Sequence, residues 1–237
     1  MKKLFLTIAA VLMLTSSAHA EGFALGVTGA LMKVDASGSE TEVGSGTKTN
    51  SDGEVTNADA SNDNILIGSI YLEYMLADTN WAGENNGFTF GVKHTPGTAD
   101  VSDDVQKRAD TAGTPGTDDD TGNREAQAEI ENYMNYYVDI PVMGSAYVKL
   151  GYSEMDVNTL ESSTATNGTA PTGYGNTSID GINYGVGFKG VTGNNLSWKV
   201  AYEIVDFDTL SLTSTTGNKI TADLDTSELN FSLGYRF

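Results

Sequence analysis

The chain has 237 residues, which is enough for one domain with a sizeable core. It carries 32 Asp plus Glu against 13 Lys plus Arg, and this net charge of −19 excludes the basic footprint that nucleic-acid binding needs. Cysteine is absent, which excludes the disulfide framework of a small secreted fold and a lipid-modified N-terminal cysteine.

The first twenty residues have the pattern of a secretory signal peptide. Two lysines precede an apolar stretch over residues 4–14, and residues 18–20, Ala-His-Ala, follow as an A-x-A cleavage site. The apolar stretch is too short to cross a bilayer as a helix, which disfavours the alternative of an uncleaved anchor. We expect residues 1–20 to be removed on export and residues 21–237 to form one domain.

Beyond residue 20 the sequence alternates between apolar residues and polar or small ones. Successive side chains of a strand point to opposite faces, so each alternating run predicts a strand with one apolar face. The runs cover residues 22–34, 64–76, 87–94, 126–140, 146–153, 182–189, 196–204 and 228–237. The last run is the clearest, since every odd position from Leu229 to Phe237 is apolar or aromatic. The second is the least regular, because both of its faces carry apolar residues.

The segments between these runs alternate in length. Connections of roughly 18 residues or more alternate with short ones of roughly 10 or fewer, and the short segments 141–144 and 190–195 are rich in turn residues. A membrane-spanning meander predicts this order, with short periplasmic turns and longer extracellular loops. We therefore predict an all-β fold, an eight-stranded antiparallel up-and-down transmembrane β-barrel. No apolar stretch beyond residue 20 is long enough to predict a transmembrane helix.

The direction of the apolar face separates a membrane barrel from a soluble one, and alternation alone leaves both open. Two features favour an apolar face that points outward to lipid. The other face is rich in Gly and Ala, which suits a crowded interior. Bulky aromatic residues of the apolar face gather near the strand ends, as in the girdles of membrane barrels. These aromatic residues are Phe23, Trp81, Tyr152, Tyr184, Trp198, Tyr235 and Phe237.

Three runs carry a resemblance to a known family. The C-terminal run 229–237, with 147–152 and 184–190, resembles strands of small Gram-negative outer-membrane barrels, of the opacity-protein-like and outer-membrane-protein-A-like kind. The resemblance implies a place in the outer membrane, in contact with its lipids and lipopolysaccharide. It also implies that the barrel-assembly machinery reads Tyr235 and Phe237 as an assembly signal. A monomer is expected.

The predicted inner face carries charges of both signs in near balance. They are Glu73, Lys93, Glu129, Glu131, Asp139, Lys149, Lys189, Lys199, Glu203, Glu228 and Arg236. Buried charges are costly unless they are paired, so these residues predict an ion-pair network that fills a narrow barrel. We expect Lys149 to pair with an inward carboxylate, with Glu73 or Glu131 as the leading candidates.

Two functions remain open after these predictions. The first is a surface-exposed structural barrel with a filled interior, whose acidic loops contact other molecules. The alternative is a narrow channel, a small porin for ions or small solutes. The first is favoured, because four tyrosines on the predicted inner face would obstruct flow: Tyr71, Tyr133, Tyr137 and Tyr147.

Four long segments are the expected extracellular loops. They span about residues 35–63, 96–125, 154–180 and 205–225, with net charges of −6, −5, −4 and −3. Their Gly, Ser, Thr, Asn and Asp content predicts mobile, solvated loops that attract divalent cations loosely. The acidic run 118–120 lacks the ligand spacing of an EF-hand, so we expect no specific metal site.

The sequence favours neither catalysis nor a cofactor. Hydrolytic chemistry on a small barrel needs a histidine beside a nucleophile or a carboxylate. His94 is the single histidine beyond residue 20, and no nucleophile motif surrounds it. We therefore expect a protein that is not an enzyme.

Overall fold

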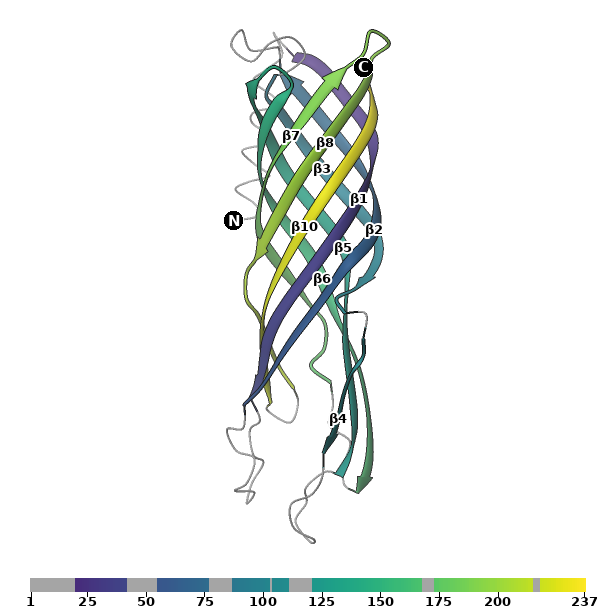
Figure 1. Cartoon of the computed structure of the whole chain (residues 1–237), viewed down its shortest axis with the longest axis vertical. Helices are drawn as coiled ribbons and strands as arrows, with labels where there is room; N and C mark the ends of the chain where they lie inside the picture. Colours follow the sequence, from purple (N-terminus) through teal and green to yellow (C-terminus); the bar gives the residue numbers. More distant parts are fainter. Residues whose placement is uncertain are drawn as a thin grey trace.

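A computed structural model of the chain describes residues 20–41, 55–76, 87–102, 104–110, 121–167, 173–214 and 218–237 (Figure 1). Its strands are β1 (Ala20–Thr41), β2 (Val55–Leu76), β3 (Thr89–Asp100), β4 (Gln106–Asp110), β5 (Thr121–Met143), β6 (Ala146–Asn167), β7 (Thr177–Val191), β8 (Leu196–Phe207), β9 (Leu210–Thr213) and β10 (Lys219–Arg236). The part of the chain that is described contains no helix long and apolar enough to cross a membrane. The predicted signal peptide lies outside these residues, except for Ala20.

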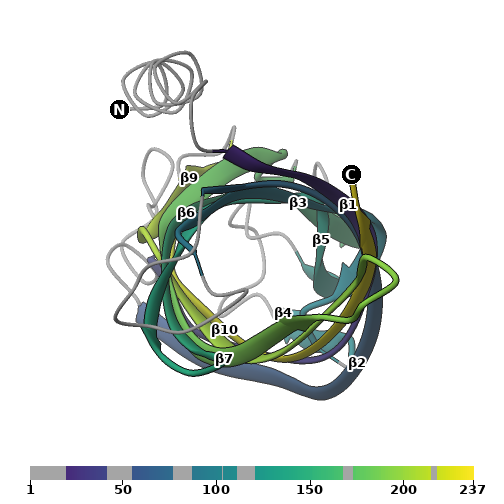
Figure 2. The ribbon, with the colours of Figure 1, turned by 90° about the horizontal axis from the view of Figure 1, so that it is seen from above.

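Eight of the strands form a closed wall. The order is β1-β2-β3-β5-β6-β7-β8-β10, and β1 pairs with β10 to close the ring (Figure 2). Every pairing is antiparallel, and each strand lies beside the next wall strand along the chain. The short strands β4 and β9 attach to β5 and β10. The predicted eight-stranded up-and-down barrel is therefore confirmed.

Tight turns define one end of the barrel, here called the turn end, at the top of Figure 1. Gly144 turns the chain between β5 and β6 with a φ of 58°, and Asn195 does so between β7 and β8 with a φ of 60°. Both residue types tolerate this left-handed conformation better than most. The backbone N–H of Phe237 donates to the carbonyl of Phe23 over 2.8 Å, so the last residue is joined to the start of β1 at this end.

Outward side chains form an apolar belt in the half of the barrel nearer the turn end. Those of β1, β2, β7 and β10 illustrate it: Phe23, Leu25, Val27, Leu31, Leu66, Ile70, Leu72, Ile182, Tyr184, Val186, Phe188, Leu229, Phe231, Leu233 and Tyr235 are all exposed. The closed wall satisfies backbone hydrogen bonds internally, which hydrocarbon requires. An exposed apolar belt on such a wall is the surface that a barrel presents to lipid.

Several strands continue far beyond this belt. β1, β2 and β6 have 22 residues each and β5 has 23, whereas about 10 tilted residues suffice to cross a membrane. The β2–β3 ladder stops at Ile70 and His94, and the β6–β7 ladder stops at Val157 and Thr177. Beyond these points the wall divides into a first ribbon, β9-β10-β1-β2, and a second ribbon, β4-β5-β6 (Figure 1).

The four segments predicted as mobile, solvated extracellular loops contain the strands of these ribbons. Much of 35–63, 96–125, 154–180 and 205–225 is strand, held by ladders that continue from the belt. The extensions are rich in Ser, Thr, Ala, Asn and Gly, which give a weak alternation on their own. Pairing with a neighbour that is already ordered supplies the missing stabilisation, because strand propensity depends strongly on context.

The irregular run 64–76 has a structural explanation. A register shift between Met32 and Val34 of β1 leaves β2 with one extra residue at this level. Ile65 and Ile67 point inward against an apolar core, while Leu66 points outward in the belt. Apolar residues therefore occupy both faces because the strand crosses the boundary between two environments.

Candidate functional site

A chain of ion pairs runs through the interior at the level of the belt. Lys93 Nζ lies 2.7 Å from Glu228 Oε2 and 3.4 Å from Glu203 Oε2. Lys149 Nζ lies 2.7 Å from Glu203 Oε1 and 3.9 Å from Asp139 Oδ1. The series of ion pairs continues through Lys199, whose Nζ lies 2.5 Å from Asp139 Oδ2, and it ends at Glu73, which Lys199 also contacts. All seven side chains are buried.

This chain of charges connects most of the barrel wall. Its members come from β2, β3, β5, β6, β8 and β10, which are six of the eight wall strands. Lys189 of β7 adds a fourth buried ammonium, which donates to the carbonyl of Gly87 and to Thr89 Oγ1. Four lysines thus accompany four carboxylates, and pairing of this kind is what allows charges to be buried.

Tyrosine rings occupy the remaining space between these charges. Lys149 Nζ lies 3.7 Å from the centre of the Tyr137 ring, and Lys199 Nζ lies 5.6 Å from that of Tyr147. Tyr71 is also buried, with its hydroxyl 3.5 Å from Ser197 Oγ. At Gly91 an added Cβ would lie 2.4 Å from the Tyr137 ring, so glycine on the wall makes room for the tyrosine. The ionic layer is therefore packed with side chains.

An apolar core fills the interior beyond the ionic layer, away from the turn end. Its buried members are Met32, Val34, Val101, Ile130, Tyr133, Met155, Val157, Ile179, Val205, Phe207 and Leu224. They come from both ribbons and from the ends of β7 and β8, and Val101 follows the end of β3. The outward residues at the same level are polar, so this half has the polarity of a soluble barrel. The apolar core was not predicted, although Val205 and Phe207 reveal a change of apolar face after Ile204.

Glu129 and Glu131 do not face the interior, and the expectation that they do is wrong. The β5–β6 register shifts between Glu131 and Met134, and Asn132 adopts a φ of 53°. Such a bulge adds one residue to a strand and exchanges its two faces beyond that point. Glu131 consequently lies opposite Asp156, on the outside of the ribbon.

The remaining predicted inner residues lie inside the wall. Glu73, Lys93, Lys149, Lys199, Glu203 and Glu228 belong to the ionic chain, and Arg236 is buried near the turn end. Lys149 pairs with an inward carboxylate as expected, but its partners are Glu203 and Asp139. The leading candidates Glu73 and Glu131 were wrong.

The outer face of the first ribbon is acidic. Asp35 of β1 lies opposite Asp225 of β10, which in turn lies opposite Asp206 of β8. Burial, and then the charge of Asp206, raise the pKa of Asp225. Lys33 offsets part of this charge, with its Nζ 3.0 Å from Asp35 and 3.4 Å from Asp63.

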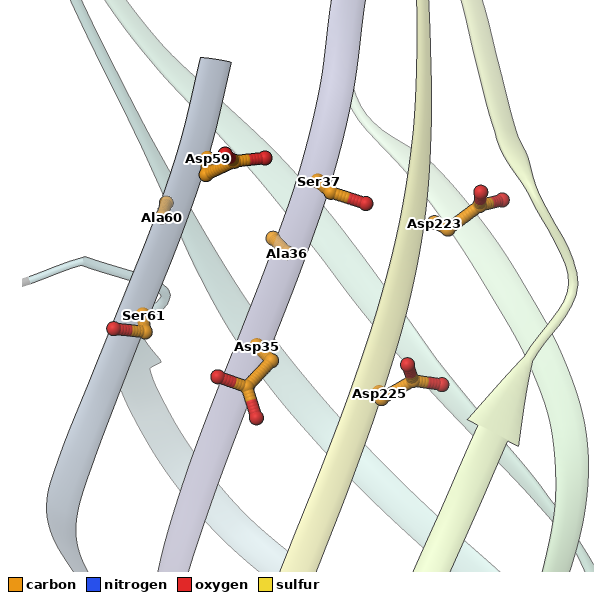
Figure 3. A pocket seen from close by; sticks show the side chains of 8 residues that line it. All are labelled: Asp35, Ala36, Ser37, Asp59, Ala60, Ser61, Asp223 and Asp225. Atoms are coloured by element: carbon orange, nitrogen blue, oxygen red, sulfur yellow. The ribbon is translucent and has the colours of Figure 1, made fainter.

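A shallow hollow of about 340 Å³ lies within this acidic face (Figure 3). Its floor is made of small residues, including Ala36, Ser37 and Ala60, and carboxylates stand around it. These carboxylates are Asp35, Asp59, Asp223 and Asp225. Within the residues that the structure describes, no group of three or more His, Asp or Glu is arranged to hold a metal ion.

His94 lies at the end of the β2–β3 ladder, opposite Ile70. Its neighbours Lys93 and Thr95 are buried inward, so His94 belongs to the outward row. The predicted acidic run 118–120 lies outside the described residues.

Comparisons with known proteins give remote similarities. No family model and no curated protein matches the chain. Among solved structures, the attachment invasion locus protein of Yersinia pestis matches with 13% identity and a TM-score of 0.39, over 92% of this chain and 99% of that one. The same protein in complex with the heparin analogue sucrose octasulfate matches with 12% identity and a TM-score of 0.35, over 90% and 99%. Neisserial surface protein A matches with 13% identity and a TM-score of 0.37, over 92% and 99%.

Proposed function

We propose that this chain is a non-conducting surface protein of the bacterial outer membrane, whose barrel anchors two ribbons outside the membrane. The apolar belt and the predicted signal peptide support the location. In this orientation the turn end faces the periplasm and the ribbons face the exterior, as the short turns of membrane barrels do. The ribbons would then carry the contacts with other molecules.

The observation that carries the proposal is that two different fillings follow each other along the barrel axis. A continuous water path would have to cross the ionic layer around Lys199 and then the apolar core around Met155. Eight-stranded barrels are normally filled by their own side chains, which is consistent with this arrangement. Among the residues that the structure describes, no observation favours the channel alternative.

Planar-bilayer recording tests the proposal. The mature protein is folded into detergent, checked for heat-modifiable gel migration, and added to a bilayer with salt on both sides. We expect no steady openings from the folded protein. Reproducible unitary currents would overturn the proposal and favour the small-porin alternative.

Matched variants make a silent recording informative. Lys199→Ala with Tyr147→Ala thins only the ionic layer, and Met155→Ala with Phe207→Ala thins only the apolar core. Each pair should stay silent, because the other layer still closes the barrel. The four changes together should produce currents if the variant folds, which the gel shift reports.

We further propose that Tyr235 and Phe237 serve as the signal for barrel assembly. Both are exposed on the outer face at the turn end, with their ring centres 5.2 Å apart. Replacement of both with Ser should lower the yield of heat-modifiable barrel in outer membranes while leaving refolding in detergent largely intact. Equal loss in both settings would indicate a structural role only.

A further inference from the structure

The long edge strands of the two ribbons, β6 and β2, differ in what lies beside them. An unpaired strand edge presents rows of N–H and C=O groups that can pair with another chain, and proteins usually cover such edges. In the second ribbon, residues 173–176 lie along the edge of β6. The backbone N–H of Tyr174 donates to Glu161 Oε2 over 2.9 Å, and Thr159 Oγ1 donates to the carbonyl of Gly175 over 3.0 Å.

Among the described residues, none covers the long β2 edge of the first ribbon in this way. Val55–Ser61 of β2 pairs with β1 on one side, from Thr41 opposite Val55 to Asp35 opposite Ser61. On the other side, the ladder between β2 and β3 begins only at Ile70. Among the described strands, none pairs with this side of Val55–Ser61. At the turn-end side of this stretch, the side-chain amide of Asn62 donates to the carbonyl of Asp100 over 3.2 Å, so the open edge ends there.

We propose that the Val55–Ser61 edge of β2 binds an extended basic segment of another protein by strand addition. The main-chain groups of the edge supply hydrogen bonds, and side chains of the outer face supply selectivity, as in other cases of strand addition. The proposal rests on the proposed function to the extent that the edge must lie outside the membrane.

The charge of the outer face selects the chemistry of the partner. Asp59 lies on the edge strand itself and exposes its side chain outward, and the hollow beside it is bordered by Asp35, Asp223 and Asp225. In an added strand, alternate side chains would stand on this outer face, opposite or diagonal to Asp59. Lys or Arg at those positions can reach Asp59, and the carboxylates of β1 and β10 farther across the face add a longer-range attraction, whereas Asp or Glu would be repelled.

A second copy of this chain fits the edge poorly. Two copies in one membrane share the direction of the membrane normal, so their tilted strands cross where the barrels touch instead of running side by side. A copy in a facing membrane could align its β2 antiparallel, but the two acidic outer faces would then meet. Like charges placed on neighbouring strands are destabilising.

Strand geometry provides a test that distinguishes main-chain pairing with β2 from charge attraction alone. In an extended strand, residues whose side chains share a face also point their N–H groups to the same edge. In a peptide of alternating Lys and Thr, one of these two residue sets therefore faces β2 with its N–H groups, and the other set faces solvent. N-methylation of the set that faces β2 removes the hydrogen bonds that the peptide donates and places methyl groups against the edge, whereas N-methylation of the other set leaves the pairing intact.

The experiment measures binding of such peptides, about ten residues long, to the full mature protein in nanodiscs, by fluorescence anisotropy at fixed salt. The unmodified peptide should bind, the Glu-Thr counterpart should not, and one of the two N-methylated peptides should bind at least about tenfold more weakly than the other. Equal affinities for the two methylated peptides, loss of both, or no binding of the unmodified peptide would overturn the proposal.

Variants locate the bound peptide. Asp59→Lys should weaken binding of the Lys-Thr peptide and allow binding of the Glu-Thr peptide. Asp208→Lys makes the same change of net charge just after β8, and it should alter the binding of neither peptide by much. Equal effects of the two variants would overturn the assignment to β2. The result is separable from the conductance test, because a conducting barrel could still bind the peptide and a silent one could fail to.

Discussion

The two halves of this barrel have opposite polarity. Near the turn end, apolar side chains such as Val186 point outward and charged side chains such as Lys199 point inward. Beyond the belt, Asp35 and Asp206 point outward while Val34 and Val205 are buried inside. The same wall strands build both halves, so the fold alone does not determine which face is apolar. The side chains of each half match the solvent that surrounds it.

The comparison also shows why the interior is filled in two ways. In the lipid-facing half, the hydrophobic effect acts on the outer face, and the interior must be satisfied by paired charges and hydrogen bonds. In the other half, water surrounds the ribbons and the inner face forms an ordinary apolar core. Each half can be broken by a different kind of substitution, and the predictions below proceed from the largest expected effect to the smallest.

Lys199→Met should give the largest loss of stability. It leaves Asp139 and Glu73 buried with less compensating charge, and breaking a buried pair typically costs about 3–5 kcal/mol. Urea unfolding of the folded barrel, read by gel mobility, measures the change. Lys33→Met is the matched control, because its ion pairs with Asp35 and Asp63 are exposed and screened by solvent. Similar losses for the two variants would contradict the buried network.

Met155→Ala tests the apolar core with no change of charge. Met155 is 1% exposed, and removal of a side chain of this size from a packed core costs about 2–5 kcal/mol. Ser61→Ala, on the exposed outer face of β2, should stay within about 0.5 kcal/mol of the native protein. If the two substitutions have equal effects on urea unfolding, the ribbons share no tight core.

Arginine placed along the outward row of β1 sharpens the boundary between the halves. Val27→Arg lies in the middle of the belt and should cost about 2–4 kcal/mol, whereas Leu31→Arg near its edge should cost about 1 kcal/mol or less. Asp35→Arg should be nearly neutral. Unfolding in lipid vesicles measures the series, and a flat profile would contradict a boundary near Leu31.

Asp225→Asn should have the smallest effect and a defined pH dependence. The raised pKa of Asp225 means that its ionised form is less favourable in the folded state than in the unfolded state. Folding is therefore penalised as pH rises from the ordinary aspartate pKa through the raised value. The variant should be slightly more stable than the native protein at neutral pH, with a small gain because solvent screens this exposed group, and the gain should vanish in acid. A gain that persists in acid would assign the effect to another cause.

The sequence predicts the belt well because its signal is local. Alternation from Leu229 to Phe237 needs no knowledge of neighbouring strands, and the structure places these odd positions outward. The inward position of Lys149 follows from the same alternation. Its partner Glu203 does not, because the level of a residue along the axis depends on the stagger between strands, which alternation leaves open.

Two features of the structure could not be predicted from alternation: the bulge in β5 and the extension of the strands beyond the belt. The extra residue near Asn132 moves Glu131 to the outer face, and nothing in the polar and apolar pattern of 126–140 announces it. The strand extensions were read as loops since Ala36, Ser37 and their neighbours are small and weakly patterned. The apolar residues Val205 and Phe207 did carry a signal, a switch of face after Ile204, that indicates a second environment.

The most direct test of the inverted polarity is a scan of single cysteines carrying spin labels along the outward row of β1, in lipid bilayers. The chain has no cysteine of its own, so each label reports one position. Collisions with oxygen should dominate at outward positions from Leu25 to Leu31, and collisions with a water-soluble relaxation agent should dominate from Asp35 onward. Uniform accessibility to the water-soluble agent along the whole row would contradict the account.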